Sequence, residues 1–102
     1  MRVAVVPMAH YNEPYMFHVM DVFHKEGHDV YGNVGTKPLK KRIRSQEKYS
    51  DFVLVMGTDN EVDTTITVYD NQKLVGTMPI QEAIAMINAR GVRYTLKEFI
   101  KE

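Results

Sequence analysis

The chain has 102 residues, enough for one domain around one hydrophobic core, and we expect residues 1–102 to form that single domain. Its 13 basic and 13 acidic residues cancel, so attraction for a polyanion depends on where the charges lie. The sequence holds no cysteine, which excludes disulfides, thiolate metal sites and thiol nucleophiles. No apolar run approaches the roughly 20 residues that cross a bilayer, and the first residues carry no export signal. We therefore expect a cytoplasmic protein with no membrane partner.

The first part of the chain predicts a strand, a helix and a second strand. Residues 2–8 are apolar and β-branched, as in a buried strand, and Pro7 can end it because proline donates no hydrogen bond to a sheet. Asn12 can cap a helix that stops at Gly27, and residues 28–31 predict a brief second strand. This order indicates a right-handed parallel crossover. The expected buried side of the helix consists of Met16, Val19, Met20 and Phe23.

A strongly basic helix and a wholly apolar strand follow one another in the middle of the chain. Thr36 and Pro38 can open the helix, and Leu39 and Ile43 share one side of it. The strand, residues 51–56, has no polar face, so we expect a central parallel strand that is covered on both sides. The other side of the helix cannot enter the core and must face outward; its cations are Lys40, Lys41, Arg44 and Lys48.

The second half of the chain predicts two more strands and an amphipathic helix. Residues 58–63 are polar and acidic and are expected to form a loop, and the alternation in residues 64–69 predicts a strand nearer a sheet edge. Turn residues then favour an antiparallel return over residues 73–78. Pro79 can open a helix that Gly91 ends. The expected buried side of that helix consists of Ile80, Ala83, Ile84 and Ile87.

The remaining residues, 91–102, predict a short C-terminal helical extension, which Thr95 can cap. Taken together, the elements predict a three-layer α/β domain with a five-stranded mixed sheet flanked by helices.

The residues that would mark a catalytic, cofactor or metal site are missing. The first strand runs into Pro7 and Met8 and not into a glycine-rich turn, which excludes the dinucleotide fingerprint and the phosphate-binding loop. The histidines follow no metal-ligand motif, so we expect them to be solvated or hydrogen bonded. We therefore predict no catalytic residue, no cofactor and no metal. The histidines are His10, His18, His24 and His28.

The order of these motifs resembles the C-terminal anticodon-binding domain of class II aminoacyl-tRNA synthetases, with the closest likeness to the threonyl type. The matching segments are VAVVPM, LKKRIRSQEKY, DFVLVMG with a glutamate soon after it, TITVYD and a final I-x-E-A-I helix, which together span residues 2–90. The resemblance implies a five-stranded mixed sheet with three helices that binds the anticodon stem and loop of tRNA. An unstacked RNA loop exposes base edges that a protein can contact.

The resemblance also suggests residues for this role. Lys41, Arg42 and Arg44 match the family's K-K-I-R segment and would face phosphates or support the structure. Glu61 matches the glutamate after the third strand, one residue later than in the usual G-x-x-E pattern. Tyr69 stands where threonyl enzymes often carry an arginine, and it could stack on a base. The full candidate RNA-binding set is Lys40, Lys41, Arg42, Arg44, Lys48, Glu61 and Tyr69.

Three classes of function stay open on the sequence. The first is a tRNA-binding module, a fragment or free-standing relative of a threonyl-type synthetase, which is no enzyme by itself and, as a fragment, would be part of a threonine-tRNA ligase. Its binding should be weak and salt dependent, because one small cationic face releases few counterions.

The second class is a protein-interaction or accessory-subunit domain that kept the fold and lost RNA recognition, with a protein partner or a synthetase catalytic domain bound to it. Tyr69, the longer acidic loop after Gly57 and the zero net charge favour it. The third class is a small-ligand or enzymatic α/β domain, for which no site can be named.

Overall fold

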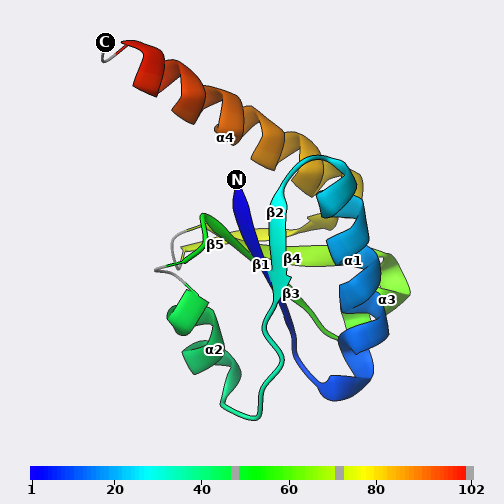
Figure 1. The fold of residues 1–102 in the computed structure, drawn as a ribbon. Coiled ribbons are helices and arrows are strands. Elements are labelled where there is room, and N and C mark those ends of the chain that lie inside the picture. Colours follow the sequence, from blue (N-terminus) through cyan, green and yellow to red (C-terminus); the bar gives the residue numbers. More distant parts are fainter. Residues whose placement is uncertain (47–48, 71–72, 101–102) are drawn as a thin grey trace.

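The computed structural model describes residues 1–46, 49–70 and 73–100, and for residues 91–100 it describes the helical backbone only. Five strands form one sheet in the order β2-β1-β3-β4-β5 (Figure 1). The first three strands are parallel, whereas β4 is antiparallel to β3 and β5 is antiparallel to β4. The five-stranded mixed sheet is therefore confirmed. The strands are β1 (Arg2–Pro7), β2 (Asp29–Gly32), β3 (Phe52–Met56), β4 (Thr65–Asp70) and β5 (Lys73–Pro79).

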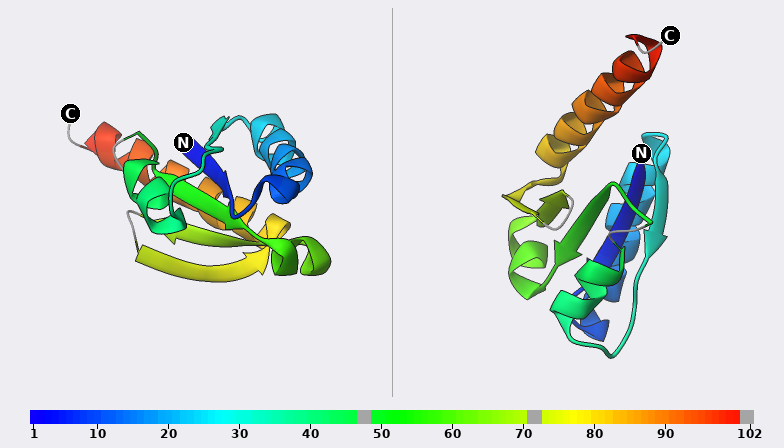
Figure 2. Two further views of the ribbon diagram at one scale, coloured as in Figure 1. Left: turned by 90° about the horizontal axis from the view of Figure 1, so that it is seen from below. Right: turned by 90° about the vertical axis from the view of Figure 1, so that its left-hand side faces the viewer.

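Helices cover both faces of this sheet, so the predicted three-layer arrangement is also confirmed. Helices α1 and α4 lie on one face and α2 lies on the other, as the end-on view shows (Figure 2). This follows from the strand order, because right-handed crossovers to opposite sides of β1 leave their helices on opposite faces. The helices are α1 (Glu13–Lys25), α2 (Leu39–Gln46), α3 (Thr58–Asp63) and α4 (Ile80–Ile100), with a short 3-10 helix at His10–Asn12 before α1.

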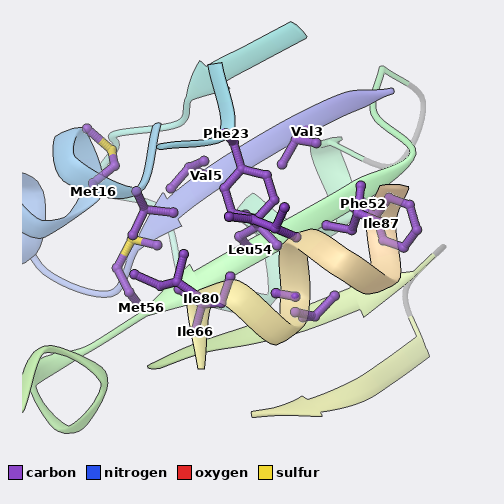
Figure 3. Packing of buried hydrophobic residues seen from close by; sticks show 14 residues of the cluster. Val3, Val5, Met16, Phe23, Phe52, Leu54, Met56, Ile66, Ile80 and Ile87 are labelled. Atoms are coloured by element: carbon purple, nitrogen blue, oxygen red, sulfur yellow. The ribbon is translucent and has the colours of Figure 1, made fainter. Parts of the chain in front are cut away.

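The hydrophobic core is divided by the sheet into a large and a small cluster. Alternate residues of β1 enter the two sides: Val3 and Val5 face the large cluster, and Ala4 and Val6 face the small one. All five residues of β3 are buried, as expected for a strand covered on both faces. Figure 3 shows the large cluster, in which α1 contributes Met16, Val19 and Phe23 and α4 contributes Ile80, Ala83, Ile84 and Ile87.

Helix α1 ends as the sequence predicted. Gly27 adopts the left-handed conformation with φ of 88°, and its N–H donates to the carbonyl of His24. Asn12 stands at the predicted N-cap, but its side chain makes no capping bond there; its Oδ1 instead accepts from the N–H of Ala9 at 3.2 Å.

None of the helices in the described part of the chain is long and apolar enough to cross a membrane.

Two predictions about local structure were wrong. Residues 58–63 form helix α3 and not a loop. Its start is supported by Asn60, whose Oδ1 accepts a hydrogen bond from the N–H of Gly57 at 2.8 Å, as the third residue of a helix does in a capping box.

Gly91 does not end α4, which continues to Ile100, so the separate helix that Thr95 was expected to cap is part of α4. A single glycine inside a helix costs only about 1 kcal/mol relative to alanine, which neighbouring helix formers can outweigh. The helix therefore runs past the edge of the sheet (Figures 1 and 2).

Candidate nucleic-acid interface

Helix α2 presents its predicted cations to solvent. Ile43 is buried in the small core cluster and Leu39 packs against it, which fixes the helix on the sheet. Lys40, Lys41 and Arg44 are exposed, and Lys48 lies outside the described residues. Lys37, just before the helix, is also exposed and adds a cation that the helical period did not include. We call Lys37, Lys40, Lys41 and Arg44 the cationic face.

Arg42 does not belong to the cationic face. Its side chain is only 6% exposed, and its Nη2 donates to the carbonyls of Pro7 at 2.6 Å and Asn33 at 2.9 Å. It thus ties the end of β1 to the loop after β2. The guanidinium lies next to buried Ile43 on the helix surface, where a long side chain can bury its stem and still reach backbone carbonyls.

Tyr69 lies on the same face of the sheet as α2. It is half-buried and packs against the small core cluster beside Leu39. The sheet continues past it, since Thr67 pairs with Thr77 and Tyr69 pairs with Leu74 across β4 and β5. Leu74 is 63% exposed, and the hydroxyls of Thr67 and Thr77 lie 2.8 Å apart in an exposed hydrogen bond. The fold therefore brings the cationic face and an open strip of sheet together.

Glu61 lies away from α2. It is half-buried in α3, near Tyr15 of α1, whose hydroxyl donates to the carbonyl of Thr65 at 2.7 Å. Burial, and then the charge of Glu61, raise the pKa of the Tyr15 hydroxyl above its usual value. The two predicted positions Glu61 and Tyr69 are thus on different sides of the sheet.

The residue three places after Gly57 is Asn60, which occupies the position of the glutamate in the G-x-x-E pattern. Asn60 is 8% exposed. Its oxygen accepts from the N–H of Gly57, and its nitrogen donates to the hydroxyl of Thr65 at 3.2 Å. The side chain at that position therefore supports the turn into α3.

A crevice of about 250 Å³ lies at the carboxyl ends of β1 and β3. The connections after these two strands leave in opposite directions, which opens a crevice in sheets of this kind. Met8 and Tyr11 are 53% and 63% exposed at its rim. The sequence carried no signal for it, because the strand order must be known first. The crevice is lined by Met8, Tyr11, Asn12, Gly57, Thr58, Asp59 and Asn60.

The histidines form no common site. His28 is buried, with its Nε2 at 2.7 Å from Oδ1 of Asn88, and His10, His18 and His24 are exposed. No group of three or more histidine, aspartate or glutamate side chains in the described part of the chain could hold a metal ion.

The fold is an open α/β domain with a cationic helix on one face of its mixed sheet. A family model described as the anticodon binding domain matches residues 2–90. The chain belongs to this family, the anticodon-binding domains of class II aminoacyl-tRNA synthetases. Domains of this family are not the catalytic part of a synthetase.

Solved structures agree on the fold. The RNA-binding domain of threonyl-tRNA synthetase from Cryptosporidium parvum Iowa II superposes with a TM-score of 0.77 at 18% identity, over 86% of this chain and 23% of that one. Histidyl-tRNA synthetase from Nostoc sp. PCC 7120 superposes with a TM-score of 0.78 at 22% identity, over 86% of this chain and 22% of that one. The chain thus spans less than a quarter of either neighbour's length. No curated protein matches the sequence.

Proposed function

We propose that this domain binds the anticodon stem and loop of a tRNA through the cationic face of α2 and the adjoining strip of sheet at Tyr69. The observation that carries the proposal is the exposure of Lys40, Lys41 and Arg44 on a helix that Ile43 fixes to the sheet of an anticodon-binding domain. Clustered cations bind phosphates by releasing counterions, a term that depends on local charge density and not on the zero net charge.

Tyr69 and Glu61, the two residues predicted to contact bases, would have different roles in this complex. Tyr69 would stack on a base beside the cationic face, because an aromatic ring tolerates any base but makes no bidentate contact. Glu61 and Asn60 have no direct role in this arrangement: Glu61 lies beside Tyr15, and the amide of Asn60 is engaged in the turn. Binding is thus expected to be weak, with little sequence preference at the Tyr69 position.

We also propose that the tRNA is of the threonine type and that a catalytic domain, joined to this chain or bound to it, supplies a threonine-tRNA ligase. The motif order supports the threonyl assignment. The fold does not select it, because the threonyl and histidyl neighbours superpose equally well. The cytoplasmic location expected from the sequence stays part of this proposal.

An NMR titration with a threonine anticodon stem-loop tests the RNA proposal. At low salt, amide shifts are expected at Lys41, Arg44 and Tyr69, and they should shrink steeply as salt is raised. The double change Lys41→Glu and Arg44→Glu should abolish binding and leave the fold intact, since both side chains are exposed. Arg2→Glu is the matched control, because Arg2 is exposed at the opposite end of β1 from α2. Equal loss of binding in the control and the double variant would count against the cationic face.

A protein-interaction domain is the second candidate, and a specific surface favours it. Met8, Tyr11 and Val34 are each more than half exposed in the segments that follow β1 and β2, at the carboxyl edge of the sheet. Exposed apolar side chains that gather at one edge are typical of contacts with another protein. Amide shifts at Tyr11 and Val34 on addition of a synthetase catalytic domain, with none on addition of RNA, would favour this candidate.

A further inference from the structure

Arg42 is a buried cation that has no carboxylate partner among the described residues. Only 6% of the residue is exposed, and Nη2 is held by the carbonyls of Pro7 and Asn33. Its Nε is buried and has no hydrogen-bond partner in the part of the chain that the structure describes. Neither of the ion pairs formed within the described residues, Lys25 with Asp21 and Arg90 with Asp70, involves Arg42.

The surroundings of Arg42 add positive potential. Burial of a charge is costly unless an opposite charge and hydrogen bonds compensate for the lost hydration. The dipoles of two carbonyls supply only part of that compensation for Arg42. Arg42 is close to the N-terminal end of α2, where the helix dipole is positive and the first turn contains no acidic residue. Lys40 and Lys41 occupy that turn. The site as a whole favours an anion.

A small pocket of about 50 Å³ adjoins this guanidinium. Its volume is that of about four water-sized spheres, so it can take one tetrahedral oxyanion and is too small for a nucleobase. It lies at the end of β1, beside the loop that leads to the cationic face. The pocket is lined by Pro7, Ala9, His10, Glu13, Val34, Gly35 and Arg42.

We propose that this pocket is a phosphate site, and that in the RNA complex it holds one backbone phosphate against Arg42. The second part rests on the proposed RNA function, whereas the first part does not. A guanidinium is suited to phosphate because its planar N–H groups can donate in parallel to two oxygens. Two carbonyls already fix its orientation, so little rotational freedom is lost on binding.

Glu13 is the competing partner, because its carboxylate lines the same pocket. A phosphate there would be repelled by Glu13, and Glu13→Gln should strengthen phosphate binding about twofold to fivefold, the effect of one partly exposed charge pair. If Glu13 is itself the counter-ion of Arg42, the unmodified chain would show no saturable phosphate binding, and the same change would lower the melting temperature. A rise in phosphate affinity would support the phosphate site, whereas a lower melting temperature in a chain that binds no phosphate would refute it.

The first experiment titrates the unmodified chain with inorganic phosphate at constant ionic strength, with chloride as the replaced anion. The side-chain Nε–H of Arg42 and the amide of Gly35 report on the pocket by NMR. A saturable shift of both, absent in Arg42→Gln and retained in Arg2→Gln, is the expected result. Shifts confined to Lys40, Lys41 and Arg44 would refute the phosphate site. This result is obtained on the unmodified chain, so it does not depend on whether any variant folds.

The second experiment replaces phosphate with the anticodon stem-loop. Movement of the Arg42 Nε–H signal, reversed by added phosphate, would show that the RNA supplies the anion. RNA binding that shifts Lys41 and Arg44 but leaves Arg42 unmoved would refute the backbone-phosphate assignment and keep the proposed function. A phosphate response without any RNA binding would keep the pocket and refute the proposed function.

Discussion

Thr64 carries a backbone strain that a single substitution should release. It follows α3 with φ of 55° and ψ of 48°, and it is the one non-glycine residue with positive φ in the part of the chain that the structure describes. Its N–H donates to the carbonyl of Asn60 and so closes the helix. The side chain is exposed. Glycine is the residue that adopts this conformation without steric cost.

Thr64→Gly should stabilise the domain by about 0.5–1 kcal/mol. The left-handed conformation costs an L-residue about 1–2 kcal/mol, while glycine loses about 0.5–1 kcal/mol more entropy on folding. The difference favours glycine, and for a domain of this size it corresponds to a rise in melting temperature of about 3–6 °C. Equilibrium urea unfolding measures the free energy directly.

Thr58→Gly is the matched control for this prediction. Thr58 is also exposed, in the first turn of the same helix, but it has negative φ. At this position glycine relieves no strain and only loses more backbone entropy on folding, so the change should lower the free energy of unfolding by about 0.5–1 kcal/mol. A Thr64→Gly protein that is less stable than the unmodified chain, or destabilised as much as Thr58→Gly, would refute the strain argument.

Two further predictions concern contacts between layers. Arg90→Met should lower the free energy of unfolding by about 1 kcal/mol, because it removes a largely buried ion pair with Asp70 that joins α4 to β4. Thermal unfolding at low and high salt measures this loss, and an unchanged melting temperature would contradict the prediction. Tyr15→Phe should cost about 1 kcal/mol at neutral pH through the lost bond to the carbonyl of Thr65. Because the pKa of the Tyr15 hydroxyl is raised in the folded state, the unfolded chain loses this proton first, and stability should fall as pH rises above about 10. The variant should lack that part of the alkaline decline, and identical pH profiles would refute the assignment.

Much of the fold follows from local pattern. The five apolar residues of β3 have no polar side, and such a run is stable only when both faces are covered. The spacing of Met16, Val19 and Phe23 predicted which side of α1 is buried. Alternation in β4 and turn residues after it predicted the antiparallel pairing with β5.

The errors occur where the capping of a helix, and not its apolar period, decides the local structure. Helix α3 depends on Asn60, whose side chain closes the turn after Gly57 and contacts Thr65 of the next strand. Residues 58–63 contain a single apolar residue, Val62, so no apolar period predicted a helix there. Conversely, Gly91 was predicted to end a helix, but glycine ends a helix only where the chain turns left-handed.

For the candidate site, the sequence by itself determined that a cationic helix lies before a buried strand, since charge and apolar period are properties of the local chain. The helical period also placed Lys41 and Arg44 outward, and both are exposed. Tertiary structure alone decided that Arg42, between them in sequence, is buried, because the carbonyls of Pro7 and Asn33 accept hydrogen bonds from its guanidinium. The helical period predicts the direction in which each side chain of α2 points. The backbone carbonyls that allow a guanidinium to be buried come from the ends of other strands, which only the folded chain brings to the helix.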